Sequence, residues 1–364
     1  MAAIWKSIRR LVSVKRKTIY DDLDELDEKR VPWPSQWRLP RVRRVSMFLF
    51  LADFMIFGIL IYLFEPLITL LVRNEELFGA RFSLAASENA TLYASYGNDR
   101  MEIPKILHQT SATANVPDSW IGPQQSCKDA YSAFEYKHWT DDLARAFISI
   151  EYPWFLDMWD GYVFPIQRAD AIRYFVLHHF GGIYLDMDTL CKEPFPVDKI
   201  DTGGGHYVLF KSTTPTGITN DFMVSTAGHP AFTNAIAKLP VYYRLTRTWA
   251  KMEPYVAIMM SSGPLFLTLV VKDYLLKLPV LPTPTVEVVT PPALSAFITD
   301  LEASSWHRSD THILMWMGER PWTWYTLGVL GLLIGVNLLN RILLLLCKVP
   351  RKLVSVAYTL KIFK

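Results

Sequence analysis

Residues 168–188 read RADAIRYFVLHHFGGIYLDMD, and this stretch decides the fold. From 167 to 180 the apolar residues recur at helical spacing, and one face carries Ile172, Phe175, Val176 and His179. Gly181 and Gly182 then end the helix, because glycine adopts the backbone conformations that terminate helices. Residues 183–187 follow as a short strand. A helix that leads directly into a buried strand predicts an α/β sheet.

Polar side chains of this stretch are expected to meet at one edge of the sheet. Asp170 and Arg173 are three residues apart on the helix, so they share a face, directed away from the side that packs on the sheet. On the strand, Tyr184, Asp186 and Asp188 point to the same side because side chains alternate. Ligands of α/β sheets bind at the carboxyl ends of the strands. The pattern therefore predicts a cleft that contains two carboxylates and a guanidinium.

The two acids indicate a divalent cation. Asp186 and Asp188 repel each other, and a hard, oxygen-preferring ion such as Mn²⁺ or Mg²⁺ keeps both ionised. A nucleotide diphosphate explains the metal, because the ion bridges carboxylate and pyrophosphate oxygens and stabilises the leaving diphosphate. Arg168 or Arg173 supplies a second positive group. A lone Asp-x-Asp is usually a surface turn, but the preceding helix and double glycine favour a site.

Shorter apolar runs predict the rest of the domain. We expect strands at 103–108, 134–139, 206–210 and 222–225, and helices at 231–238 and 263–276. The proline-rich stretch 281–292 is expected to be an extended edge or loop around 286–289. Strands that alternate with helices predict an α/β fold for the middle of the chain.

Two apolar segments are long enough to cross a bilayer. We expect transmembrane helices at 46–72 and 323–347. Arginines precede the first segment and basic residues follow the second, so both termini are expected in the cytosol and the middle in the lumen. The resulting domains are a cytosolic segment 1–45, a luminal stem 73–100, a catalytic domain 101–320 and a cytosolic tail 348–364. The glycosylation sequon at 89–91 fits a luminal stem.

Overall composition excludes several classes of protein. The 364 residues carry a formal net charge of +3, which does not suggest a nucleic-acid binder. The three cysteines have no metal-ligand spacing. Cys127 and Cys191 either pair in an oxidising compartment or remain two separate thiols, and the sequence leaves both alternatives open.

The segment 168–188 resembles the signature of the glycosyltransferase family with a sugar-binding DXD motif, which fungal mannosyltransferases and clostridial glucosylating toxins share. Residues 103–110, IPKILHQT, resemble the first nucleotide-binding strand of that family. The sequences SGP at 262–264 and SWH at 305–307 resemble its later landmarks. The resemblance covers roughly residues 100 to 310, and the two apolar segments with the SWH ending most resemble the catalytic subunits of fungal mannosyl phosphorylinositol ceramide synthases.

This resemblance implies a GT-A, Rossmann-like fold, a retaining transfer from GDP-mannose to inositol phosphorylceramide, and a multi-pass Golgi membrane protein. Asp188 would bind the metal directly, and Asp186 would reach it through water or contact the ribose. Asp170 and Arg173 would hold the transferred sugar. Tyr184 would pack near the nucleotide sugar, and His307 would complete the metal shell.

Other roles rest on position alone. Arg168 is a candidate donor contact. His108 ends the first predicted strand, where it either contacts the donor or forms structural hydrogen bonds. Aromatic residues around Trp316 and Trp322, before the second apolar segment, are typical of an interfacial belt, which either only anchors the chain or also holds the site against the bilayer so that a lipid headgroup reaches it. Asp53, inside the first apolar segment, is either a packing residue or a contact for a regulatory membrane subunit.

Three alternatives remain open at this point. A mannosyltransferase of the same family could act on N-glycans or proteins, although such enzymes usually carry a single anchor. A metal-dependent membrane hydrolase would require a closer ligand cluster than two aspartates and the distant His307. A non-catalytic membrane subunit would be expected to have lost Asp186 or Asp188, and both are present.

Overall fold

The computed structural model describes residues 44–80, 82, 101–200, 202, 205–214, 216–277, 286–301, 316 and 320–361. It divides into two compact units. One comprises residues 60–331 and contains the α/β domain, and the other comprises residues 1–59 and 332–364. The sequon at 89–91, the SWH sequence at 305–307 and most of the expected stem lie outside the described residues.

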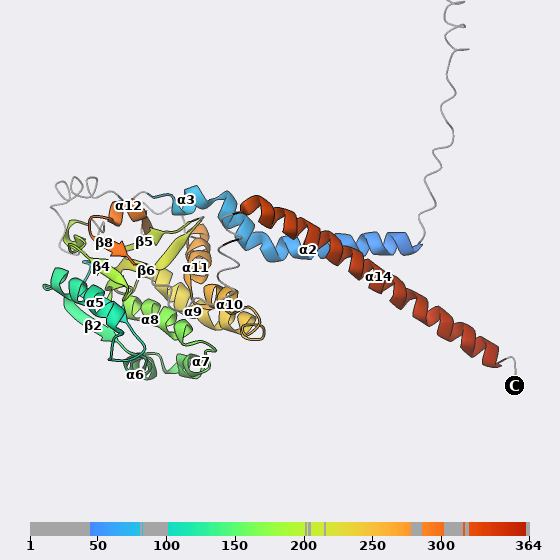
Figure 1. The fold of residues 1–364 in the computed structure, drawn as a ribbon, viewed down its shortest axis with the longest axis horizontal. Helices are drawn as coiled ribbons and strands as arrows, with labels where there is room; N and C mark the ends of the chain where they lie inside the picture. The colour runs from blue at the N-terminus through green and yellow to red at the C-terminus, as the bar shows by residue number, and fades with distance from the viewer. Residues whose placement is uncertain are drawn as a thin grey trace, which may run out of the picture. The chain divides into compact units, whose positions relative to one another are not determined.

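A six-stranded mixed sheet in the order β2-β1-β3-β6-β5-β7 forms the centre of the domain (Figure 1). Its strands are β1 (Ile106–Thr110), β2 (Glu135–Trp139), β3 (Gly182–Leu185), β5 (Val208–Ser212), β6 (Ile218–Ser225) and β7 (Val286–Val289). β1 is parallel to β2 and β3, β6 is antiparallel to β3 and β5, and β7 is parallel to β5. β4 (Thr189–Cys191) and β8 (Ile298–Asp300) form a separate antiparallel ribbon. The predicted α/β class is therefore confirmed.

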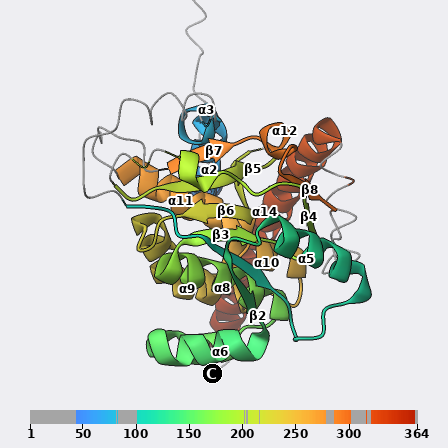
Figure 2. The same cartoon turned by 90° about the vertical axis from the view of Figure 1, so that its left-hand side faces the viewer.

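Helices cover both faces of this sheet (Figure 2). They are α5 (Asp118–Ala130), α6 (Asp141–Glu151), α7 (Leu156–Asp160), α8 (Pro165–Phe180), α9 (Pro230–Thr246), α10 (Pro254–Ser261), α11 (Pro264–Lys277) and α12 (Pro291–Leu294), with short 3-10 turns at Pro153–Phe155 and Val197–Lys199. The core on one face contains side chains of α6, α8, α9 and α11, and the core on the other contains Cys127 of α5 and Cys191 of β4. Tyr184 belongs to the first core, while Ile183 and Leu185 belong to the second, as the alternation of β3 predicts.

Local sequence explains where α8 begins and ends. Pro165 occupies the first turn, where a missing N–H costs nothing, and the Gln167 side chain accepts a 3.0 Å hydrogen bond from the Phe164 N–H. Gly181 and Gly182 have φ of 66° and 94°, which glycine adopts without strain. This break turns the chain directly from α8 into β3.

Three helical stretches are long and apolar enough to cross a membrane by length and composition. Met47–Val72 lies in α2 (Arg44–Val72), and Tyr325–Leu345 lies in α14 (Pro321–Lys361). The third, Pro254–Lys277, comprises α10 and α11, and 61% of its apolar window is buried in the domain, against 0% for the other two. The two exposed stretches are therefore the candidate spans, and they match the two that the sequence predicts. α14 continues as helix into the expected tail.

The inner end of α2 packs against the α/β domain. Leu70 is 2% exposed and belongs to the same core as α8 and α11. The Lys272 ammonium of α11 donates a 3.1 Å hydrogen bond to the Pro66 carbonyl. Asn74, at the start of α3 (Asn74–Phe78), accepts a 3.0 Å hydrogen bond from the Gly217 N–H. The carboxyl-terminal end of the first candidate span therefore packs directly on the α/β domain.

Candidate active site

The two acids lie in a tight turn between β3 and β4. β3 ends at Leu185, so the predicted strand 183–187 is too long, and Asp188 belongs to the turn. The Thr189 N–H donates to the Asp186 carbonyl over 3.1 Å and closes the turn. The Leu301 N–H donates to the Asp188 carbonyl over 3.2 Å, which ties the turn to the end of β8. The positions of both acids are thus set by backbone hydrogen bonds.

Asp186 is paired with protein groups on its inner side. The Arg173 Nη1 lies 3.0 Å from its Oδ1, and the Tyr184 hydroxyl donates to the same oxygen over 2.8 Å. Thr110 in turn hydrogen-bonds the Tyr184 hydroxyl over 2.9 Å, and the guanidinium carbon of Arg173 lies 4.8 Å from the centre of the Tyr184 ring. These contacts fix one face of the Asp186 carboxylate and leave the other toward a cavity.

The electrostatic surroundings of Asp186 favour a cation. Burial raises the pKa of Asp186 to about 7, and the carboxylates of Asp221 and Asp188 act in the same direction against the nearby charge of Arg173. Its side chain still exposes 27% of its surface, so the raised pKa reflects crowding by carboxylates and protein rather than complete enclosure. A divalent ion at this carboxylate would offset the excess negative charge.

Behind Arg173 lies a second, fully buried layer. Asp170 is 4% exposed and accepts hydrogen bonds from the Asn220 Nδ2 at 2.9 Å and the Ser262 hydroxyl at 3.1 Å. The Arg173 Nη2 lies 3.5 Å from its Oδ1. Burial raises the pKa of Asp170, while Arg173 opposes this shift. Asp170 and Arg173 share a face of α8 as expected, and Arg173 reaches the cavity. The expectation that Asp170 also reaches the cleft is wrong, because its side chain is buried behind Arg173.

A cavity of about 340 Å³ opens beside the acids. Its lining residues are Thr110, Ser111, Ala112, Thr113, Asn115, Pro117, Trp120, Asp141, Pro165, Ile166, Ala169, Arg173, Asp186, Met187 and Asp188. Arg173, Asp186 and Asp188 were expected here, whereas Asp170, Arg168, Tyr184 and His108 do not line it. Trp120 and Thr110 line the cavity but were not among the predicted site residues. Trp120 offers an aromatic face. Thr110 could have been found from its position at the carboxyl end of β1, where α/β sheets bind ligands.

Two of the predicted donor contacts have other partners. The Arg168 Nη2 donates to Asp141 over 3.1 Å, so it orients a carboxylate of the cavity wall. His108 is 0% exposed, its Nε2 lies 2.9 Å from the Gly181 carbonyl, and the Trp139 indole N–H donates to its Nδ1 over 3.0 Å. Burial lowers the pKa of His108 to about 4. Its neutral ring therefore links β1, β2 and the Gly181 turn. Of the two roles expected for His108, donor contact or structural hydrogen bonds, the structure has the second.

A buried lysine stands behind the turn. Lys211 of β5 pairs with Asp221 of β6 and lies 3.1 Å from the Asp300 Oδ2 at the end of β8. The Asp221 carbonyl accepts a 3.0 Å hydrogen bond from the Asp186 N–H. Burial lowers the pKa of Lys211, but the Asp221 and Asp300 carboxylates outweigh it, and the net shift is upward. Nothing in the sequence pattern indicated this cluster.

The donor set of this turn fits a hard divalent ion. Asp186 and Asp188 provide carboxylate oxygens on one cavity, and an ion such as Mg²⁺ is commonly held by one or two carboxylates together with substrate phosphates. Within the described residues no group of three or more His, Cys, Asp or Glu side chains is arranged to hold a metal. His307, the expected third ligand, lies outside the described residues.

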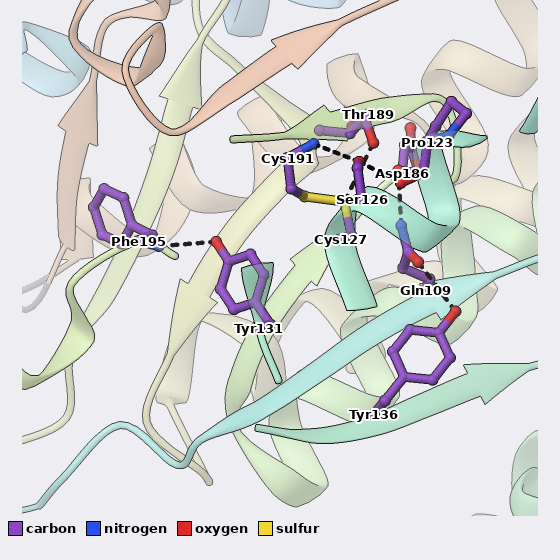
Figure 3. The surroundings of a disulfide bond; sticks show 10 residues. All are labelled: Gln109, Pro123, Ser126, Cys127, Tyr131, Tyr136, Asp186, Thr189, Cys191 and Phe195. Carbon is purple, nitrogen blue, oxygen red and sulfur yellow. Dashed lines mark hydrogen bonds between the residues drawn. A yellow bond between two sulfur atoms is a disulfide. The ribbon is translucent and has the colours of Figure 1, made fainter. Parts of the chain in front are cut away.

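A disulfide bond joins Cys127 of α5 to Cys191 of β4 (Figure 3). Of the two alternatives that the sequence left open, the structure has the bonded one. The Ser126 hydroxyl next to it accepts a 3.0 Å hydrogen bond from the Cys191 N–H. The bond therefore connects the strand that follows the acidic turn to the helix that carries Trp120.

Comparison with known proteins agrees with this site. A family profile described as "Glycosyltransferase sugar-binding region containing DXD motif" matches residues 117–207. Inositol phosphoceramide mannosyltransferase 2 of Schizosaccharomyces pombe is 40% identical over 230 residues, which cover 59% of this chain and 61% of that protein. Mannosyl phosphorylinositol ceramide synthase SUR1 of Saccharomyces cerevisiae is 38% identical over 216 residues (58% and 54%). Inositol phosphoceramide mannosyltransferase 3 of S. pombe is 38% identical over 248 residues (66% and 66%).

The chain spans between 54% and 66% of the length of these curated relatives. Among solved structures, the PaToxG glycosyltransferase aligns with a TM-score of 0.37 at 13% identity over 52% of this chain and 76% of that one, a likeness too low to support an argument. The match at 117–207 includes α5, α8 and the Asp186–Asp188 turn. Residues 117–207 therefore carry a glycosyltransferase sugar-binding region with its DXD motif, and the chain is similar in sequence to inositol phosphoceramide mannosyltransferases of fungi.

Proposed function

We propose that the protein transfers mannose from GDP-mannose to inositol phosphorylceramide and forms mannosyl-inositol phosphorylceramide, with retention at the sugar. One observation carries the proposal: Arg173, Asp186 and Asp188 line a single cavity inside the region that matches the sugar-binding DXD family. The names of the similar fungal proteins support the choice of sugar and acceptor.

The roles follow from position in the cavity. Asp188 binds the divalent ion, Mn²⁺ or Mg²⁺, directly. Asp186, already held by Arg173 and Tyr184, reaches the ion through water or contacts the ribose. When bound, the ion supplies positive charge for the diphosphate leaving group. Arg173 faces the transferred sugar or its phosphate, and the buried Asp170 orients Arg173 from behind.

The aromatic side chain of the cavity wall suits the nucleoside. Trp120 is half-buried at the start of α5 and lines the same cavity as the acids. Its flat face stacks on the base, while Thr110 and Ser111 offer hydroxyls at the end of β1. With the base at Trp120, the diphosphate would lie toward the Asp186–Asp188 turn of the same cavity.

A lipid acceptor fits the aromatic residues before α14 and at its start. Trp316, Trp322 and Tyr325 are 48%, 82% and 65% exposed, as expected for residues of a membrane interface. In the proposal this belt positions the site for a lipid headgroup. Replacing Trp316 and Trp322 by Ala is expected to weaken transfer to membrane lipid more than hydrolysis of the donor, and equal loss of both would contradict the idea.

The proposed location is the Golgi membrane, with a luminal domain and cytosolic termini. The Cys127–Cys191 bond supports an oxidising compartment for the domain, as the lumen is. A regulatory membrane subunit belongs to the proposal, with Asp53 as its candidate contact. In the structure the Asn340 amide donates a 3.1 Å hydrogen bond to Asp53, so part of this carboxylate is satisfied within the chain.

Two other functions are less well supported. A membrane hydrolase needs a compact ligand cluster, and no such cluster occurs among the described side chains. A same-family enzyme for N-glycans or proteins shares the site but has no use for the interfacial aromatics.

Mannose transfer from GDP-mannose to inositol phosphorylceramide should be measured in membranes, with and without Mn²⁺, for the wild type and Asp188→Ala. Metal-dependent transfer that the variant loses supports the proposal. Transfer to glycans alone, or hydrolysis without an acceptor, supports one of the alternatives.

A further inference from the structure

We propose that the end of α9 and the segment leading into α10 dock on a lipid surface that carries anionic headgroups. This surface, here called the α9–α10 surface, consists of Val241, Arg244, Leu245, Arg247, Lys251 and Met252. It is separate from the cavity and from the two candidate spans, and its role does not depend on the proposed sugar transfer.

The apolar part of the α9–α10 surface is exposed to solvent. Val241, Leu245 and Met252 are 48%, 57% and 80% exposed. At about 100° per residue, Val241 and Leu245 lie on the side of α9 opposite the buried Leu239. Single exposed apolar residues are common, but large ones interleaved with cations are typical of helices that lie on membranes.

The charged part is complementary to anionic lipid. Arg244, Arg247 and Lys251 are exposed, and none of them forms an ion pair with a carboxylate among the described residues. Glu253 is the one acid that follows directly in this segment. The net positive charge attracts anionic headgroups, while the neighbouring apolar side chains enter the boundary between headgroups and acyl chains.

The packing of the domain ties this surface to the first candidate span. α9 and α10 both pack on α11. α11 in turn holds the inner end of α2 through the hydrogen bond from Lys272 to the Pro66 carbonyl. The helices that present the α9–α10 surface therefore pack on the same helix that contacts the end of the first candidate span.

The test uses the full chain in nanodiscs of phosphatidylcholine, with or without phosphatidylinositol. Thr248, exposed within the surface, is replaced by Cys in a Cys347→Ala background and labelled with an environment-sensitive fluorophore. Doxyl-labelled lipid is expected to quench the label at least twofold more strongly in the anionic discs. A label at Gln125→Cys, on α5 at the opposite face of the sheet, should show no such quenching.

Two variants separate charge from apolar contact. Arg244→Gln, Arg247→Gln and Lys251→Gln together should abolish the dependence on anionic lipid. The matched variant Lys105→Gln, Lys192→Gln and Lys199→Gln, with the same change of charge, should retain it. Leu245→Gln with Met252→Gln should reduce quenching in both kinds of disc.

Free access of iodide to the label at Thr248, without quenching by doxyl lipid in anionic discs, would overturn the proposal. Equal quenching for the two triple variants would do the same. Because the readout involves no sugar transfer, either result leaves the proposed enzymatic function untouched.

Discussion

The guanidinium of Arg173 lies 3.0 Å from the carboxylate of Asp186, so the first acid of the DXD motif already has a cationic partner in the protein. Asp188 lines the same cavity two residues further along the turn. Asp186 is therefore held by a cation of the protein before any ion or donor arrives.

Replacing the two acids should have different effects. Asp188→Asn is expected to lower metal-dependent transfer at least about 100-fold with little change in thermal stability, because Asp188 is only half-buried, in a turn beside the cavity. Asp186→Asn should also lower the melting temperature, because it leaves Arg173 with a weaker partner. Transfer rates and thermal melts of the two variants decide the point, and indistinguishable melts would contradict it.

Arg173→Lys should fail to rescue the site. The planar guanidinium of Arg173 contacts the carboxylates of Asp186 and Asp170. Its Nη1 also donates a 2.9 Å hydrogen bond to the Asn220 carbonyl. A lysine keeps the charge but cannot contact all three groups at once, so the half-buried Asp186 and the buried Asp170 lose part of their pairing. We expect a loss of roughly 3 kcal/mol in the free energy of unfolding and loss of transfer. Arg145→Lys, at an exposed pair with Asp160, is the control and should change stability by less than about 1 kcal/mol.

Stability should fall in mild acid because of His108. Its pKa is lowered to about 4 by burial, so between about 6.5 and 4 the unfolded chain binds a proton that the folded chain does not. The contribution is complete above pH 6.5 and is lost progressively as the pH falls toward 4, by roughly 3 kcal/mol in all. His108→Gln should flatten this part of the curve of unfolding free energy against pH. An unchanged slope in the variant would show that another group is responsible.

Loss of the disulfide should affect both stability and the site. The Cys127–Cys191 bond closes a loop with a sequence separation of 64, and its removal is expected to cost about 2–4 kcal/mol. Because β4 follows Asp188 directly, Cys127→Ala with Cys191→Ala should also raise the Mn²⁺ concentration needed for half-maximal transfer. Calorimetry and metal titration measure the two effects, and Cys347→Ala serves as the control.

The double glycine should not tolerate side chains. A Cβ at Gly181 would lie 2.6 Å from the Ala227 nitrogen, and one at Gly182 would lie 2.5 Å from the Ile106 carbonyl oxygen. Both have positive φ, so Gly181→Ala is expected to destabilise the fold by more than about 2 kcal/mol. Gly122→Ala in α5 meets nothing within 4 Å and should be neutral or slightly stabilising.

The local pattern predicted much of this molecule. Apolar periodicity identified α8 and β3, the length of two apolar runs identified the candidate spans, and the acidic pair identified the turn beside the cavity. These features depend on residues close in sequence, whose spacing alone decides helix, strand or turn. The prediction that strand alternation orients Asp188 was wrong, because β3 ends at Leu185, two residues before the predicted end.

Only the tertiary structure decided which side chains meet. Lys211 reaches Asp300 across 89 positions, and Cys127 reaches Cys191 across 64. The pairing of β8 with β4, and the packing of α5 on β4, bring these distant residues together. The tertiary structure also buries Asp170 behind Arg173, and it gives both ring nitrogens of His108 hydrogen-bond partners. Periodicity encodes which face of an element is apolar, but the partner of a polar side chain depends on the neighbouring element, and strand order sets that neighbour.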